Sequence, residues 1–194
     1  MRIHRVSIRN FRSVKNIDII LDNFSIFVGQ NNHGKTNLFE AIEWFYNAKS
    51  SPEDYYFEKH TTEPIEVELE YVCVSDDDIE KLSVEASKTK IRNLLDGETT
   101  FVIKKNSTTH KRAYFVNGED KGNPSGLDTA INEFLPKLEY VNTKIRLEDV
   151  SQYKDKNPIG QMLSGVLTEI VAQSEDYKAF RAQFQKLFED EGSE

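Results

Sequence analysis

The chain of 194 residues contains a single cysteine, Cys73, so it cannot form an internal disulfide. It has no apolar run that approaches the roughly 18 residues of a membrane span, and its first residues lead into no signal-peptide core. Basic residues are in the minority, because 25 Lys and Arg stand against 33 Asp and Glu for a net charge of −8. These absences favour a cytoplasmic protein that does not bind nucleic acid strongly by itself.

The basic residues that are present gather at the start of the chain. Before the first acid, Asp18, the sequence carries Arg2, Arg5, Arg9, Arg12 and Lys15. Two interpretations remain open. Such a segment can touch the phosphates of DNA or of a nucleotide, or it can be a half-exposed edge strand whose arginines are solvated.

The most specific pattern is GQNNHGKT at residues 29–36, which has the form G-x-x-x-x-G-K-[ST] of a phosphate-binding loop. The apolar run at 24–28 precedes it and predicts a buried strand. The run TNLFEAIEWFYNA follows and places its apolar residues on one face at helical spacing. Strand, loop and helix therefore come in the order that phosphate binding requires.

Such a loop binds anions with its backbone. Gly29 and Gly34 permit main-chain angles that turn successive N–H groups inward, and the helix that begins near Lys35 adds the positive end of its dipole. We expect Lys35 to reach the β- and γ-phosphates of ATP and the Thr36 hydroxyl to take one position on Mg²⁺. The remaining loop residues, Gln30, Asn31, Asn32 and His33, are expected to contribute mainly backbone.

The rest of the chain has an alternating pattern of strands and helices. In the strand expected at 65–74, Cys73 falls on the apolar face, which predicts an inert core thiol, and three glutamates line the other face, as in an antiparallel sheet. Further strands are expected at 2–9, 17–21, 99–105, 111–117 and 138–141. Helices are expected from Ser75 to about Ala86, with a serine cap, and at 125–135, 159–171 and 175–188.

A nucleotide hydrolase also needs an acid at the end of an apolar strand to hold Mg²⁺ through water. The nearest candidate is the sequence VCVSD at 72–76, but its acids are better interpreted as the start of a helix. The sequence therefore assigns no catalytic residue in this chain.

The start of the chain resembles a known class of proteins. The segment IRNFRSVKNIDIIL, followed by FVGQNNHGKTNLFEAI, is similar to the N-terminal ATPase lobe of the SMC, RecF and OLD (overcoming lysogenization defect) class of ABC-type ATPases. In that class a strand pair with the pattern NF-R precedes a loop of form G-x-N-x-x-G-K-[ST]-N, which Asn31 and Asn37 match. The later segments EPIEVELEYVCVSDDDIEKL, KRAYFVNGED and LPKLEYVNT are loosely similar to the OLD branch, whose members carry a C-terminal Toprim nuclease.

This resemblance implies an α/β fold: an ABC-type P-loop NTPase lobe with a mixed sheet, an antiparallel β segment and a C-terminal helical arm. It implies a lobe at 1–145 and a helical segment at 146–194 that serves as a truncated arm or dimerisation element. It places Arg12 and Asn37 near the nucleotide. The signature motif, the Mg²⁺-side acid and the nuclease follow the helical insertion in that class, so the chain is expected to be an N-terminal fragment or one half of a split system.

Two hypotheses of different class follow. In the first, the chain belongs to an ATPase of DNA processing, an OLD-like nuclease used in repair or phage defence, which hydrolyses ATP only with a C-terminal lobe and assembles as a homodimer or higher oligomer through its ATPase lobes. DNA is then a partner of the complete protein. The alternatives are a non-catalytic nucleotide-binding and dimerisation module, or an SMC/RecF-type repair ATPase without a nuclease.

Overall fold

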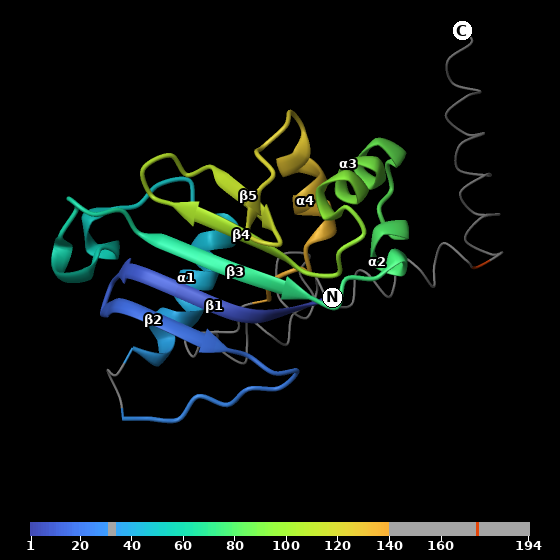
Figure 1. Cartoon of the computed structure of the whole chain (residues 1–194). Coiled ribbons are helices and arrows are strands. Elements are labelled where there is room, and N and C mark those ends of the chain that lie inside the picture. Colours follow the sequence, from blue (N-terminus) through green and yellow to red (C-terminus); the bar gives the residue numbers. More distant parts are fainter. Residues whose placement is uncertain (31–33, 140–173, 175–194) are drawn as a thin grey trace, which may run out of the picture. The chain divides into compact units, whose positions relative to one another are not determined.

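The computed structural model describes residues 1–30, 34–139 and 174 of the chain (Figure 1). Residues Met1–Leu138 form one compact unit, built on a six-stranded sheet. Its elements in chain order are β1 Arg2–Phe11, β2 Val14–Ile20, α1 Lys35–Asn47, the short 3₁₀ helices η1 Glu53–Tyr55 and η2 Phe57–Lys59, β3 Glu66–Val72, α2 Asp76–Glu80, α3 Glu85–Leu95, β4 Phe101–Asn106, β5 Arg112–Val116, β6 Glu119–Asp120 and α4 Leu127–Phe134.

The strands pair in the order β2-β1-β3-β4-β5-β6, and every pair of neighbours is antiparallel. The α/β class with an antiparallel segment, expected from the sequence, is confirmed. β1 lies between β2 and β3, so the interpretation of the arginine-rich first strand as an edge strand is wrong. The 138–141 strand and the helices expected at 159–171 and 175–188 fall mostly or wholly outside the described residues.

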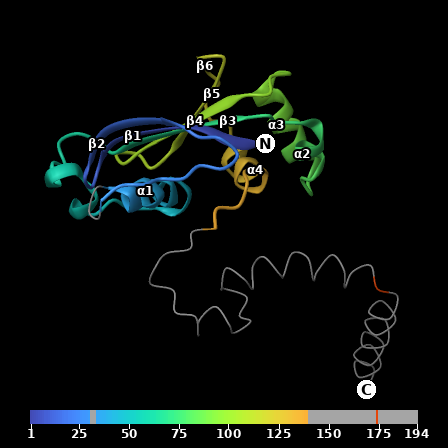
Figure 2. The same cartoon turned by 90° about the horizontal axis from the view of Figure 1, so that it is seen from below.

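One face of the sheet is covered by helices and the other is wet. Figure 2 shows α1 and α4 lying on the same side of the strands. Toward that side β1, β3 and β4 direct alternate apolar residues that are at most 1% exposed: Val6, Ile8, Val67, Leu69, Tyr71, Phe101 and Ile103. Helix α1 completes the core with Leu38, Ala41, Ile42, Trp44 and Phe45, so the helical spacing read from the sequence is confirmed. Burial of this apolar area is the main stabilising contribution to the fold.

The segment at 24–28, expected to be a buried strand, is not one among the described residues. A strand needs hydrogen bonds to a neighbouring strand, and residues 22–30 form no ladder with any described strand. Phe24, Ile26 and Val28 are 81%, 71% and 86% exposed. Only Phe27 turns inward, where its ring meets that of Phe39 edge to face at 5.7 Å. The segment therefore has the pattern of a strand without a strand beside it.

Cys73 is exposed, so its expected place in the core is wrong. The chain leaves the extended conformation there, because Cys73 adopts a φ of 58°. Val74 points into the core instead and is 6% exposed. Its N–H donates to the carbonyl of Thr99 at 3.0 Å. The predicted alternation of inward and outward side chains over 65–74 is therefore interrupted at Cys73.

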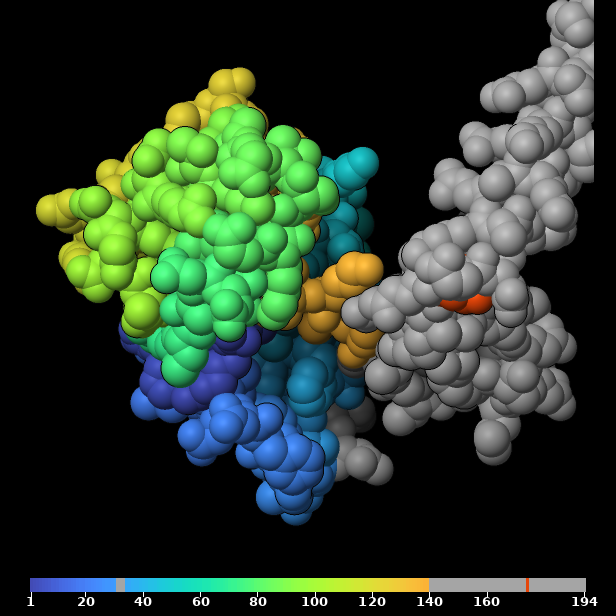
Figure 3. All heavy atoms as spheres, turned by 90° about the vertical axis from the view of Figure 1, so that its right-hand side faces the viewer, coloured from blue at the N-terminus to red at the C-terminus, as the bar shows by residue number. Residues whose placement is uncertain are grey.

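The single helix expected from Ser75 to about Ala86 is two helices. The serine cap is confirmed, since Ser75 and Asp78 form a reciprocal capping box at the start of α2. The helix then ends because Leu82 turns into the core and the N–H of Ser83 donates to Glu133 of α4 at 2.7 Å. Figure 3 shows this end of the molecule, with α2 and α3 at the surface. No helix within the described residues is long and apolar enough to cross a membrane.

Candidate nucleotide site

The phosphate loop ends at the first residue of α1. Gly34 caps this helix with a φ of 78°, in the left-handed region that glycine adopts at least cost. A Cβ atom at Gly34 would lie 2.9 Å from the Oγ of Ser13 in the turn between β1 and β2. Glycine is required at this position by its backbone angle and by the close approach of Ser13. Asn31, Asn32 and His33 lie outside the described residues.

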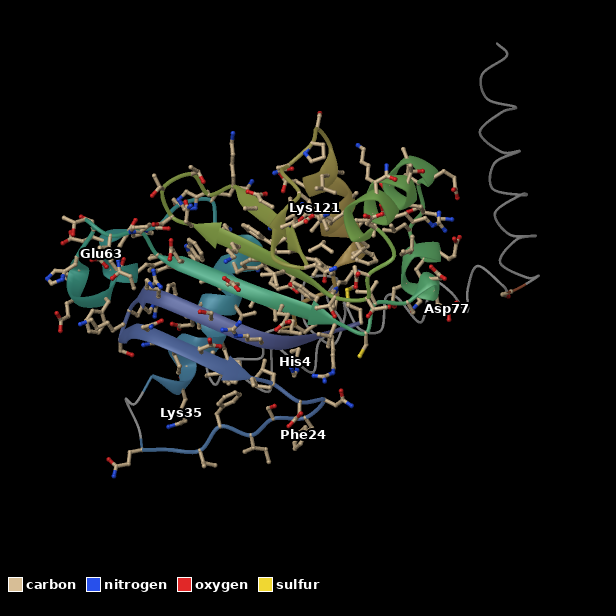
Figure 4. All side chains as sticks on the ribbon, viewed as in Figure 1. His4, Phe24, Lys35, Glu63, Asp77 and Lys121 are labelled. Atoms are coloured by element: carbon tan, nitrogen blue, oxygen red, sulfur yellow. The ribbon has the colours of Figure 1, made fainter. Side chains whose placement is uncertain are left out.

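Lys35 lies at the start of α1 with its side chain turned toward the loop (Figure 4). Its Nζ donates to the carbonyl oxygens of Gly29 at 2.6 Å and Gln30 at 2.7 Å. The ammonium is therefore placed over the loop by hydrogen bonds that phosphate oxygens can replace. Gly29 and Gln30, both predicted nucleotide-binding residues, are thus brought together with Lys35.

The first turn of α1 suits an anion. Among the described residues of this turn none is acidic, so no carboxylate opposes a phosphate at the positive end of the helix. Thr36 is exposed in this turn, where its hydroxyl is accessible to a metal ion. Asn37 is instead engaged with the protein, because its Nδ2 donates to the Oγ of Ser13 at 2.6 Å. Its place is beside the loop, fixing the start of α1 to the β1–β2 turn.

Arg12 lies in the same turn between β1 and β2, with a φ of 49°. Its guanidinium forms an ion pair with Glu40 of α1 and lies 4.9 Å from the ring centroid of Tyr55. Its Nε is buried and has no acceptor within the described part of the chain. Arg12 is thus close to the helix that carries Lys35, but its charge is compensated by a carboxylate.

A groove of about 330 Å³ opens beside the loop. Gly34 and Lys35 line one part of it, and both polar and apolar residues of 13–19, together with apolar side chains of residues 27–28 and of α1, line the rest. The groove therefore lies directly beside the ammonium of Lys35.

The acids at 76–78 lie at the other end of the sheet. β3 ends where Val72 pairs with Arg2, whereas the loop contacts the turn that follows Phe11. β1 has 10 residues, so at about 3.3 Å per residue these two ends are about 30 Å apart. In Figure 4, Asp77 and Lys35 lie toward opposite ends of the sheet. These acids cannot serve a metal at the loop, and within the described residues no group of three or more potential ligands is gathered.

The arginines at the start of the chain are compensated within the protein. Arg2 donates to the carbonyl of Leu21 at 2.8 Å, Arg5 pairs with Asp18, Arg9 lies 3.2 Å from Glu66, and Arg12 pairs with Glu40. On the wet face Lys104 and Glu68 continue the pattern at 2.8 Å. Such exposed pairs stabilise little. They nevertheless leave this face without an excess of positive charge for a phosphate backbone.

The sequence interpretation missed three residues around α1. Ser13, Glu40 and Lys105 each contact the helix or its cap. The signal for Lys105 was present, because a lysine occupied an inward position of the strand at 99–105. No local signal marked Ser13 or Glu40, since their contacts join residues 24 and 28 positions apart in the chain.

Known proteins resemble the chain over most of its length. A family model described as an AAA ATPase domain matches residues 1–187. The Old nuclease of Escherichia phage P2 is 31% identical over 183 residues, which cover 91% of this chain and 31% of that protein. The chain therefore spans less than a third of the length of this relative.

Two further similarities are shorter or more distant. The DNA replication and repair protein RecF of Rickettsia massiliae (strain Mtu5) is 44% identical over 45 residues, 23% of this chain and 12% of that protein. A solved structure from work on ATP-driven dimerisation and DNA-stimulated activation of SMC ATPases aligns with a TM-score of 0.46 and 19% identity. It covers 83% of this chain and 95% of that one.

Proposed function

The chain belongs to the AAA ATPase domain family, and from that membership we propose that it is the Mg·ATP-binding lobe of an ABC-type ATPase that acts in DNA processing. The observation that carries the proposal is the start of α1. Gly34 caps the helix, Lys35 is held over the loop, and no acidic residue of the described first turn opposes an anion. These residues fit the triphosphate of ATP.

Each residue of the site has its own role in binding the nucleotide. The backbone of residues 29–34 binds the β-phosphate, Lys35 bridges the β- and γ-phosphates, and Thr36 supplies one oxygen to Mg²⁺. Arg12 supports the phosphates from the β1–β2 turn, and Asn37 holds that turn against the helix through Ser13. When bound, Mg²⁺ neutralises phosphate charge and orients the γ-phosphate.

We propose further that the chain binds ATP without turning it over by itself. The transition state of phosphoryl transfer needs groups around the transferred phosphoryl, including one that orients the water. The acids at 76–78, which follow β3, lie about 30 Å from the loop. A C-terminal lobe with a signature motif and a Mg²⁺-side acid supplies these groups.

The exposed apolar segment supports such a second lobe. Phe24, Ile26 and Val28 lie immediately before the loop and are largely exposed. Contiguous exposed apolar side chains mark a surface that another part of a protein covers, and their alternation suits a strand laid beside them. The chain spans 31% of the Old nuclease, which leaves ample length for a further lobe in a full-length protein of that kind.

The biological setting remains part of the proposal. The name of the Old nuclease describes it as a nuclease. Because the chain is similar to it, we propose that the chain is part of an OLD-like nuclease of repair or phage defence. We propose that the complete protein to which this chain belongs acts in the cytoplasm, dimerises through its ATPase lobes and contacts DNA. We propose that residues 1–145 belong to the ATPase lobe and that 146–194 serve as its helical arm. The alternative is a nucleotide-binding and dimerisation module without catalysis. Its only support is that the acids at 76–78 lie far from the loop.

Phosphate release tests this division of labour. The 194-residue protein with Mg·ATP should release phosphate no faster than its Lys35→Ala variant. A version that continues through the residues homologous to the rest of the Old nuclease should turn ATP over, and Lys35→Ala should abolish that turnover. Release by the short chain that is lost in Lys35→Ala would show that the missing acid lies within these 194 residues.

A further inference from the structure

The end of α1 that lies away from the nucleotide loop is held by a buried lysine of the sheet. Lys105 is 5% exposed and occupies an inward position of β4, where the inward residues before it are apolar. Its Nζ donates to the carbonyl oxygens of Trp44 at 3.1 Å, Phe45 at 3.0 Å and Ala48 at 2.7 Å. The ammonium also lies 4.9 Å from the ring centroid of Trp44.

At this end α1 has one backbone capping bond, from the N–H of Ala48 to the carbonyl of Trp44 at 3.0 Å, and no side-chain cation of its own. Its last turn, all of it described, carries no basic residue, and Ala48 at the cap is extended, with a φ of −74°. The last carbonyls of a helix have no partners within the helix and favour a cation. Lys105 has three N–H donors, one for each of the three carbonyls. A buried ammonium is costly unless its donors are used, and here all three are used.

A second cation from the next strand supports the first. Arg112 stands opposite Lys105 in the register of β4 and β5. Its Nη2 donates to the carbonyl of Tyr46 at 3.4 Å, and its guanidinium lies 5.4 Å from the ring centroid of Phe45. Two adjacent strands therefore hold the last turn of α1 by its carbonyl oxygens.

The two ends of α1 are fixed by different parts of the sheet. Asn37 ties the first turn to Ser13, and Lys105 ties the last turn to β4. A helix of 13 residues is a rod about 20 Å long. The position of its last turn therefore sets the direction in which the first turn presents its N–H groups and Lys35.

We propose that Lys105 is a positioning residue for the nucleotide site, a cation that aligns the phosphate-binding helix by capping its far end. The proposal rests on the proposed function, because it concerns the same site. Lys105 does not touch the nucleotide; it acts through α1. Replacing it should weaken ATP binding in molecules that are fully folded.

Calorimetric titration of Mg·ATP into Lys105→Met tests this proposal. Methionine has a similar length but no donor, so ATP affinity should fall about tenfold, the loss expected when one charge-assisted phosphate contact is misplaced. Lys104→Met is the matched control, since Lys104 is the next residue, lies on the wet face and pairs with Glu68. It should bind ATP as the wild type does. Circular dichroism identifies a temperature at which each variant is folded.

The wild type offers a second readout if Lys105→Met folds poorly. Burial, with repulsion from Arg112, lowers the pKa of Lys105 to about 8. Of the other groups beside it, the pKa of His110 is lowered by burial and that of Tyr46 is raised by burial. A pKa of about 8 means that Lys105 loses its charge mostly between pH 7 and 9. ATP affinity should therefore fall over that interval in the wild type and not in Lys105→Arg.

The outcomes separate this inference from the proposed function. If the wild type does not bind ATP, the proposed function fails. If the wild type binds and folded Lys105→Met binds equally well, Lys105 merely stabilises the fold and the inference is overturned. Equal pH dependence of affinity in the wild type and Lys105→Arg would overturn it as well.

Discussion

At the residue scale, Arg12 joins the turn between β1 and β2 to the segment that follows α1. Its backbone N–H donates to the carbonyl of Tyr55 at 2.8 Å, and its guanidinium lies over the ring of the same residue. The ion pair with Glu40 then connects this pair to the second turn of α1. Arg12 is thus able to contribute to ATP binding in two ways, by contacting phosphate or by supporting α1.

Two substitutions distinguish these roles. Arg12→Ala removes the charge and should weaken ATP binding about tenfold if the guanidinium contacts phosphate, a loss of about 1.4 kcal/mol. Glu40→Gln breaks the ion pair but leaves Arg12 in place, so its ATP affinity should stay within about threefold of the wild type. Calorimetric titration measures both. An equal loss in the two variants would assign Arg12 a purely structural role.

At the element scale, the chain contains one well-buried strand and one exposed strand-like segment before the loop. Ile8 of β1 is 0% exposed, whereas Ile26 is 71% exposed. Ile8→Ala should lower the free energy of unfolding by about 2 to 5 kcal/mol, because it leaves a cavity in the core. Ile26→Ala should change it by no more than about 0.5 kcal/mol.

Urea denaturation of the two isoleucine variants measures this difference. Both substitutions remove the same atoms, so each serves as the control for the other. A loss of stability in Ile26→Ala similar to that in Ile8→Ala would mean that residues 24–28 are already covered in the isolated chain. The proposed need for a second lobe would then lose its structural support.

The same elements show how far the sequence predicts the fold. The loop, the start of α1 and the hairpin of β4 and β5 were predictable, because each depends on residues that are close in the chain. Residues 24–28 were not, because burial of a strand depends on a neighbour far away in sequence. The prediction that Cys73 is buried was wrong because of a single backbone angle. The contacts of Arg12 with Glu40 and of Lys105 with α1 join distant residues that no local pattern relates.

At the scale of the whole molecule, the net charge limits the affinity of the chain for DNA. The net charge is −8, and three of the first four arginines form ion pairs with carboxylates of the protein. The isolated chain should therefore bind duplex DNA no more tightly than the non-specific range of about 10⁻⁴ to 10⁻⁶ M at physiological salt. Fluorescence anisotropy with two unrelated duplexes measures this. A nanomolar complex with one sequence would place a specific DNA site on this lobe.

The central claim is that the loop at 29–36 binds Mg·ATP. Calorimetric titration of Mg·ATP into the wild type, Lys35→Ala and Lys49→Ala tests it directly, because Lys49 is an exposed lysine just beyond the other end of α1. The wild type and Lys49→Ala should bind equally, and Lys35→Ala at least about tenfold more weakly, since it loses charge-assisted contacts to two phosphates. Equal affinity of Lys35→Ala and the wild type would contradict the account.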